Sequence, residues 1–141
     1  MKEAIDREEA HRRAIGEIVR FHRALEDWFR GTLPEDQLNP QLLDMLHSEF
    51  HIVFPSGVLV SCSDLCRSLR AGRGQSPELR ITIAEPQVLC VFPGLILANY
   101  IEHQTGARNS LAENRRRATV LFQIEERLLW RHLHDTGLSI A

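Results

Sequence analysis

The first thirty residues carry one apolar stripe with a helical period. Its members are Ala14, Ile18, Phe21, Leu25, Trp28 and Phe29. Their spacing of three and four residues predicts an amphipathic helix over residues 3–30. The stripe is weak before Ala10, so we expect residues 1–12 to be a helical start that frays. Gly31 follows the last periodic position and is suited to cap the helix.

From residue 48 onward the pattern alternates with a period of two, which is typical of strands. The predicted strands cover residues 48–55, 58–61, 79–92, 95–104, 117–125 and 128–136. Short helices are predicted over residues 40–46 and 64–71, the second capped by Ser63. Pro86 interrupts the third strand and implies a bulge or an edge position, and Glu126-Arg127 reads as a tight turn. Helices first and strands last predict a single α+β domain over residues 1–141, with helices packed on one face of a curved antiparallel sheet.

Composition narrows the possible functions. The 141 residues carry a formal net charge of −2, so no basic field attracts nucleic acid. No apolar run is long enough to span a membrane. Three cysteines without a dense spacing predict reduced thiols and a cytoplasmic protein. The basic run Arg115-Arg116-Arg117 reads as a solvated strand start.

Tyr100, Glu102 and Gln104 alternate along one predicted strand and therefore project from the same face. A phenol and a carboxylate that line a pocket can transfer a proton, with Tyr100 as hydrogen-bond donor and Glu102 as base. The alternative is that these polar groups lie on an exposed or subunit-facing side of the sheet.

Trp130, His132 and His134 form a second set with the same spacing. Two histidines can offer nitrogen ligands to a metal, but no third ligand lies across the predicted turn, so we predict no metal site. Leu129 and Leu133 continue the apolar face of the neighbouring strand. That pattern turns Trp130, His132 and His134 toward the opposite, outer face of the sheet.

Three segments together resemble a known family. They are Phe50 to Gly57, Tyr100 to Gln104 and Leu129 to Thr136. In their order and spacing the chain resembles the nuclear-transport-factor-2-like superfamily, in its SnoaL-like and ketosteroid-isomerase-like branch. The resemblance implies a cystatin-like cone, in which a curved sheet wraps the first long helix and a pocket opens at one end. It also implies frequent dimers through the sheet, and it allows the two histidines to face the pocket instead.

The family hosts many activities, so three functional hypotheses follow. The first is a homodimer that binds a small hydrophobic ligand through a pocket, without a cofactor. Its expected ligand-binding residues are Trp28, Phe54, Gln104, His132 and His134. The second is an isomerase, cyclase or dehydratase that acts on a small carbonyl compound through Tyr100 and Glu102. The third is a protein–protein association module that binds through the sheet face or the Arg115–Arg117 region.

Overall fold

The computed structural model describes residues 5–108 and 110–140 as one α+β unit. Its helices are α1 (Arg7–Arg30), α2 (Leu38–Gln41) and α3 (Cys62–Ala71), with short 3₁₀ turns at Glu35–Gln37 and Leu43–Met45. Its strands are β1 (Leu46–Val53), β2 (Leu59–Ser61), β3 (Arg80–Phe92), β4 (Leu95–Thr105), β5 (Glu113–Ile124) and β6 (Leu128–Leu138). The predicted fold class is confirmed.

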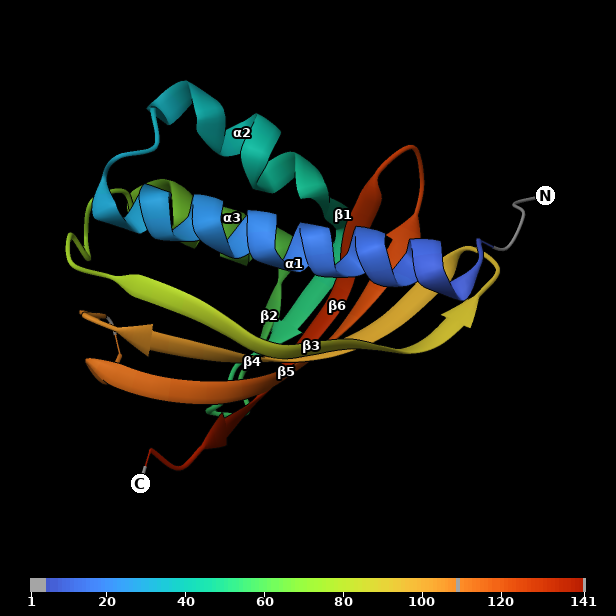
Figure 1. Ribbon diagram of the computed structural model, residues 1–141. Coiled ribbons are helices and arrows are strands. Elements are labelled where there is room, and N and C mark those ends of the chain that lie inside the picture. The colour runs from blue at the N-terminus through green and yellow to red at the C-terminus, as the bar shows by residue number, and fades with distance from the viewer. Residues whose placement is uncertain (1–4, 109, 141) are drawn as a thin grey trace.

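The strands form one curved sheet in the order β2-β1-β6-β5-β4-β3. Its neighbours are antiparallel except β1 and β6, which run parallel. The sheet wraps around α1, which lies across its concave face, while α2 and α3 cover the end near β1 (Figure 1). The concave face therefore carries the core, and the convex face is left without a helix over it.

Both ends of α1 are fixed by capping. Asp6 accepts a hydrogen bond from the backbone N–H of Glu9 at 2.8 Å, and Gly31 takes the left-handed conformation that the sequence predicts for it (φ 85°). Residues 1–4 of the expected frayed start lie outside the described residues, and the helix itself begins at Arg7. The predicted stripe faces the sheet, where Ala14 and Ile18 are fully buried.

The boundaries of two helices and one turn differ from those predicted. The cap of α3 is Ser61, not Ser63, because the Ser61 backbone is extended and its side chain accepts a hydrogen bond from the backbone N–H of Asp64 at 3.3 Å. Pro40 is the third residue of α2, not its first, because the initial turn of a helix leaves N–H groups without partners and so accepts proline there. The β5–β6 turn contains three residues, since Ile124 pairs with Leu128.

Pro86 behaves as predicted in both respects. It lies in β3, which forms one edge of the sheet. The pairing with β4 shifts between Ala84 and Gln87, and Glu85 there has a φ of 50°. A proline at a bulged edge strand costs no ladder hydrogen bond.

A second bulge, in β6, overturns the predicted faces of this strand. Phe122 of β5 pairs with Trp130 of β6, whereas the preceding residue, Leu121, pairs with His132. Arg131 is therefore an extra residue in the ladder. Trp130 and Leu133 consequently both point to the concave side and are buried. The expectation that Trp130 shares a face with His132 and His134 is wrong, because one inserted residue changes the alternation.

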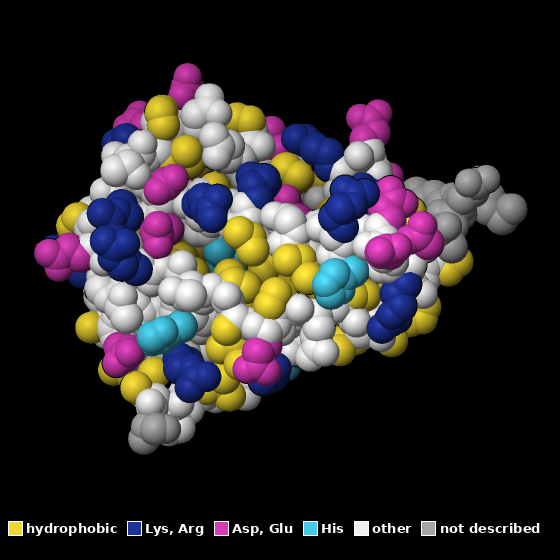
Figure 2. All heavy atoms as spheres, in the orientation of Figure 1, with side chains coloured by type: hydrophobic (Ala, Val, Ile, Leu, Met, Phe, Trp, Pro, Cys, Tyr) yellow, Lys and Arg dark blue, Asp and Glu magenta, His cyan; other side chains and the backbone are white. Residues whose placement is uncertain are grey.

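None of the helices that the structure describes is long and apolar enough to cross a membrane. Figure 2 shows hydrophobic side chains gathered where α1 meets β3, with arginines on the solvent side of the helix. This seam is one visible edge of the core described above.

Candidate functional site

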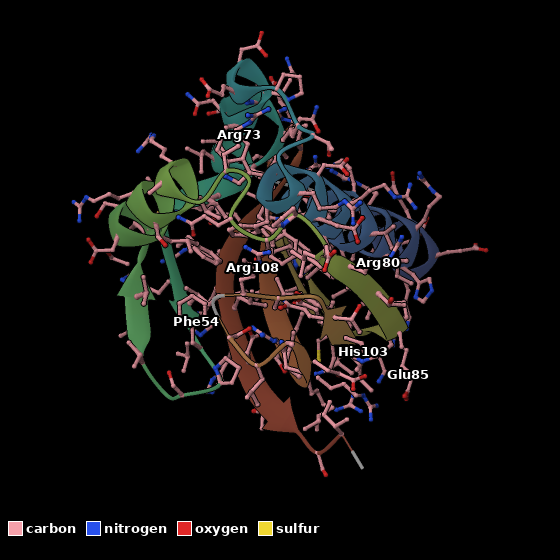
Figure 3. All side chains as sticks on the ribbon, turned by 90° about the vertical axis from the view of Figure 1, so that its left-hand side faces the viewer. Phe54, Arg73, Arg80, Glu85, His103 and Arg108 are labelled. Carbon is pink, nitrogen blue, oxygen red and sulfur yellow. The ribbon has the colours of Figure 1, made fainter. Side chains whose placement is uncertain are left out.

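A cavity of about 730 Å³ lies between the concave sheet face, α1 and α3. Most of its wall is apolar, and the residues that contribute include Phe21, Leu25, Phe29, Phe50, Ile52, Leu65, Leu69, Trp130 and Leu133. Its size falls within the roughly 300–1,000 Å³ that is usual for small-molecule sites. Phe54 and the segment joining β4 to β5, which carries Arg108, lie at the end of the molecule that Figure 3 shows.

The β4–β5 segment is held against the loop before β3. The backbone N–H of Arg108 donates to Ser76 Oγ at 3.1 Å. Gly106 has a φ of 73°, and a Cβ there would lie 2.2 Å from the carbonyl oxygen of Glu78. Only glycine fits such a close approach, so Gly106 fixes how this segment, with Ala107 and Leu111, borders the cavity.

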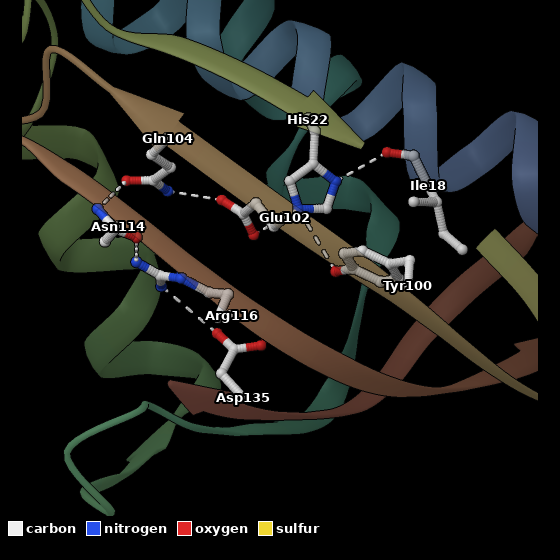
Figure 4. A network of polar contacts seen from close by, with 8 residues as sticks. All are labelled: Ile18, His22, Tyr100, Glu102, Gln104, Asn114, Arg116 and Asp135. Carbon is white, nitrogen blue, oxygen red and sulfur yellow. Dashed lines mark hydrogen bonds and ion pairs between the residues drawn. The ribbon is translucent and has the colours of Figure 1, made fainter. Parts of the chain in front are cut away.

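At one wall the apolar lining gives way to a buried polar cluster (Figure 4). Its first pair is His22 from α1 and Glu102 from β4, whose Nε2 and Oε1 atoms lie 3.2 Å apart. The Nδ1–H of His22 donates to the Ile18 carbonyl at 2.8 Å. The Gln104 amide donates to the other Glu102 oxygen at 2.5 Å. Both oxygens of Glu102 are thus engaged.

The surroundings of His22 and Glu102 favour the charged form of both groups. Burial alone would lower the pKa of His22, but the charge of Glu102 and the hydrogen bonds to Glu102 and Ile18 outweigh it and raise that pKa. Burial alone would raise the pKa of Glu102, but His22, then Arg116 and Gln104, bring it down to about 2. A carboxylate this acidic is a poor base.

The second pair, Arg116 from β5 and Asp135 from β6, is looser. Arg116 Nη1 lies 3.5 Å from Asp135 Oδ2, and Arg116 Nη2 donates to Asn114 Oδ1 at 2.6 Å. Among the described residues, Arg116 Nε and Asp135 Oδ1 have no hydrogen-bond partner although both atoms are buried. Burial, followed by the charge of Glu102, raises the pKa of Asp135 to about 7, against the opposing effect of Arg116 and His22.

Orphaned buried polar atoms at a cavity wall are unusual, because such groups normally find partners. Here one is a donor and the other a carboxyl oxygen, and both residues line the cavity. The arrangement can therefore hold a polar group of a bound molecule and exchange a proton with it.

The structure brings together part of the predicted site. Glu102, Gln104 and Phe54 line the cavity, with Glu102 and Gln104 on the concave face as their alternation predicts. Tyr100 shares this face but is fully buried beneath the cavity, with its hydroxyl 3.4 Å from His22 Nε2. It supports His22 and does not reach the cavity wall.

The other predicted ligand-binding residues lie elsewhere. Trp28 is a core residue whose Nε1–H donates to the Leu69 carbonyl at 2.6 Å, joining α1 to α3. His132 and His134 pair with Leu121 and Thr119, the partners that the sequence predicts, and point to the convex face. Burial, together with His134 and His51, lowers the pKa of His132. Trp28, His132 and His134 are all absent from the cavity lining.

The sequence patterns did not identify three residues of the buried polar cluster, His22, Arg116 and Asp135. His22 lies four residues after Ile18, inside the apolar stripe. This position indicates that its side chain faces the sheet. Arg116 alternates with Ala118 and Val120 on the buried face of β5, so it is not part of a solvated strand start. Asp135 alternates with Leu133, which the sequence pattern places on the apolar face of β6, and this position was the signal for its place on the concave side.

No group of three or more histidine, cysteine, aspartate or glutamate side chains forms a metal-ligand set within residues 5–108 and 110–140. The four charged residues of the buried cluster instead form two ion pairs, His22 with Glu102 and Arg116 with Asp135.

Comparison with known proteins places the fold. No protein-family model and no curated protein matches the sequence. Among solved structures, an NTF-2 like protein of unknown function from Pseudomonas aeruginosa is 29% identical, with a TM-score of 0.81 over 89% of this chain and 98% of that one. A Streptomyces avermitilis protein of the NTF2-like family, whose name proposes a dehydratase, is 14% identical, with a TM-score of 0.70 over 94% and 98%.

A CaMKII hub shares the same architecture. The S. rosetta CaMKII hub is 12% identical, with a TM-score of 0.70 over 91% of this chain and 96% of that one. The names of these neighbours range from a protein of unknown function to a CaMKII hub, so the shared fold does not by itself indicate an activity. The resemblance that the sequence indicated is confirmed at the level of fold: the chain has the fold of NTF2-like proteins.

Proposed function

We propose that this protein binds a small, mainly apolar molecule that carries one polar group. The cavity of about 730 Å³ supports this proposal most directly. Its apolar wall is interrupted by one polar cluster, which contains two unpartnered buried atoms. Apolar walls supply affinity, and a few convergent polar groups supply orientation. The ligand's polar group would meet Arg116 and Asp135, while its apolar part would pack against the aromatic and aliphatic wall.

The two tryptophans offer a direct test of this proposal. Trp130 lines the cavity and Trp28 does not, and the sequence contains no other tryptophan. The probe is 8-bromo-octan-1-ol, whose bromine quenches tryptophan emission on contact. In the Trp28→Phe variant it should quench the emission of Trp130 in a saturable manner.

The matched control is Trp130→Phe, which leaves Trp28 as the reporter. Its emission should change far less at the same probe concentrations. Equal quenching of the two variants, or none in either, would contradict ligand binding in this cavity.

Proton transfer on the bound molecule is a second candidate function. Glu102 was the expected base, but both of its oxygens are engaged and its pKa is about 2. Asp135 is better suited, since its pKa is about 7 and its Oδ1 is free of partners among the described residues. Tyr100 would act as a positioning residue behind His22. Dehydration of β-hydroxy ketones by the parent protein and by two variants tests this assignment. Asp135→Asn should abolish any turnover, and Glu102→Gln should retain part of it.

We also propose that two copies associate through the convex sheet face. Leu97 and Leu121 pair across β4 and β5 on that face, and Leu129 lies on the same face of β6, opposite Gln123. All three leucines are only half-buried. Phe92 on the adjacent edge strand is 47% exposed. Apolar residues in such continuity are typical of protein–protein contacts. The likeness to a hub domain is compatible with self-association.

A further inference from the structure

We propose that the polar group held in the cavity is the carboxylate of a small apolar acid, and that it binds together with one proton taken up by Asp135. This inference rests on the proposed ligand-binding function and names the chemical class of the ligand. It follows from the hydrogen-bonding capacity of the two unpartnered atoms and from the charges that face them.

The unpartnered atoms define what the ligand must offer. Arg116 Nε carries a hydrogen that can only be donated, so the ligand must present an acceptor there. Asp135 Oδ1 accepts when the carboxyl is ionised and donates when it is protonated. A ligand carboxylate satisfies both atoms when Asp135 carries the proton: one of its oxygens accepts from Arg116 and the other from Asp135.

The charged groups around Asp135 favour the protonated form when an anion is bound. His22 on α1 and Glu102 on β4 form one ion pair and neutralise each other. Arg116 on β5 faces Asp135 at 3.5 Å. β1 and α3 present apolar side chains to the cavity, among them Phe50 and Leu65.

Near the mouth two further charged residues border the cavity, Glu113 and Arg115 of β5, and Glu113 is paired with His103 at 2.9 Å. Within the buried polar cluster, Arg116 is therefore the cation whose partner, Asp135, can lose its charge by taking up a proton. Once Asp135 is protonated, Arg116 is buried without a counter-charge, which is costly. A ligand carboxylate restores the balance, whereas an alcohol or a ketone does not.

The proton and the ligand should consequently bind as a linked pair. Asp135 has a pKa of about 7 in the empty cavity, and a second carboxylate beside it raises that pKa further. Above that pH the protein must take up a proton in order to bind the anion. Affinity for a carboxylate should then fall about tenfold per pH unit above neutrality and be nearly constant below it.

Calorimetric titration of the full chain tests this linkage with two matched probes, octanoate and octan-1-ol. We expect octanoate to bind more tightly than octanol at about pH 6 and to weaken by about tenfold between pH 7.5 and 8.5. Octanol affinity should not change across this range. Repeating the titration near pH 8 in buffers of different ionisation enthalpy should reveal uptake of about one proton per octanoate bound.

Three variants separate the contributions. Asp135→Asn should bind octanoate with no pH dependence and no proton uptake. Arg116→Gln should weaken octanoate binding by about tenfold or more and octanol binding much less, because octanol loses a hydrogen bond but no charge pairing. The control Arg117→Gln removes the next arginine of the same strand, which donates to Asn99 on the convex face, and should behave like the unmodified protein. Circular dichroism verifies that each variant is folded.

The alternative outcomes are distinct. Octanol binding as tightly as octanoate, or an octanoate affinity that is independent of pH, would overturn this inference and leave the cavity as a site for neutral ligands. Failure of both probes to bind would contradict the proposed function as well. Linkage that persists in Asp135→Asn would assign the proton to another group and would also overturn the inference.

Discussion

At the scale of single residues, the buried carboxyl of Asp135 is the group whose ionisation should be visible in stability. Its pKa is raised from the ordinary 3.8 to about 7. Between about pH 4 and 7 the folded protein therefore holds a proton that the unfolded chain has released. Stability contributed by this group falls as the pH rises through that window and is lowest above it.

Asp135→Asn should remove this dependence. We expect the variant to be more stable than the parent at pH 8 by about 2 kcal/mol, with little difference near pH 4. Urea unfolding at both pH values measures it. The exposed Asp64→Asn change on α3, where Asp64 pairs with Arg67, is the control and should leave the pH dependence of the parent intact. A parent protein whose stability rises between pH 5 and 8 while the Asn variant shows the same slope would refute the assignment.

In the His22–Glu102 pair, we expect removal of the carboxylate to destabilise the protein. Glu102→Ala leaves a buried imidazolium without a counter-charge and should lower the free energy of unfolding by about 3 kcal/mol. The double variant His22→Leu with Glu102→Leu removes both charges and should recover at least half of that loss. Thermal unfolding of the single and double variants at neutral pH provides the comparison. Losses that simply add would show that the pair is not coupled.

At the scale of secondary-structure elements, the β6 bulge decides which side chains reach the cavity. Deleting Arg131 turns the bulge into a regular ladder, in which Trp130 and Leu133 keep the concave face and His132 keeps the convex one. That variant should fold cooperatively with a reduced melting temperature. Deleting His134 from the regular part of the strand moves Asp135 to the convex face, so octanoate binding should be lost. The octanoate titration tests both deletions, and retained binding in the His134 deletion would contradict the register described here.

The same strand shows why prediction from the sequence has a limit. The apolar stripe of α1, the Pro86 bulge and the common face of Tyr100 and Glu102 were predictable, because each depends on residue spacing alone. The inward position of Trp130 was not, because Arg131 has no property that marks it as an inserted residue. His22 was predictable in position, but its role becomes evident only when the sheet brings Glu102 from eighty residues later in the chain to within 3.2 Å.

At the scale of the whole molecule, the convex face should mediate self-association. Leu121→Glu places a charge in the middle of its half-buried leucines and should convert a dimer into a monomer, because a buried interface charge without a partner is costly. Sedimentation velocity measures the change. Leu111→Glu, at a residue that borders the cavity and is 77% exposed, is the matched control and should leave the mass unaltered. Identical masses for the parent and Leu121→Glu would rule out this face as the interface.

We propose that the cavity holds an apolar acid at Arg116 and Asp135. A crystal structure of the protein with 8-bromo-octanoate tests it most directly, since the bromine marks the tail and the carboxylate marks the head. We predict an anomalous bromine peak among the apolar side chains of the wall, with the carboxylate in hydrogen-bond contact with Arg116 Nε and Asp135 Oδ1. An empty cavity at saturating ligand, or a carboxylate turned toward solvent with the bromine against Asp135, would contradict the account.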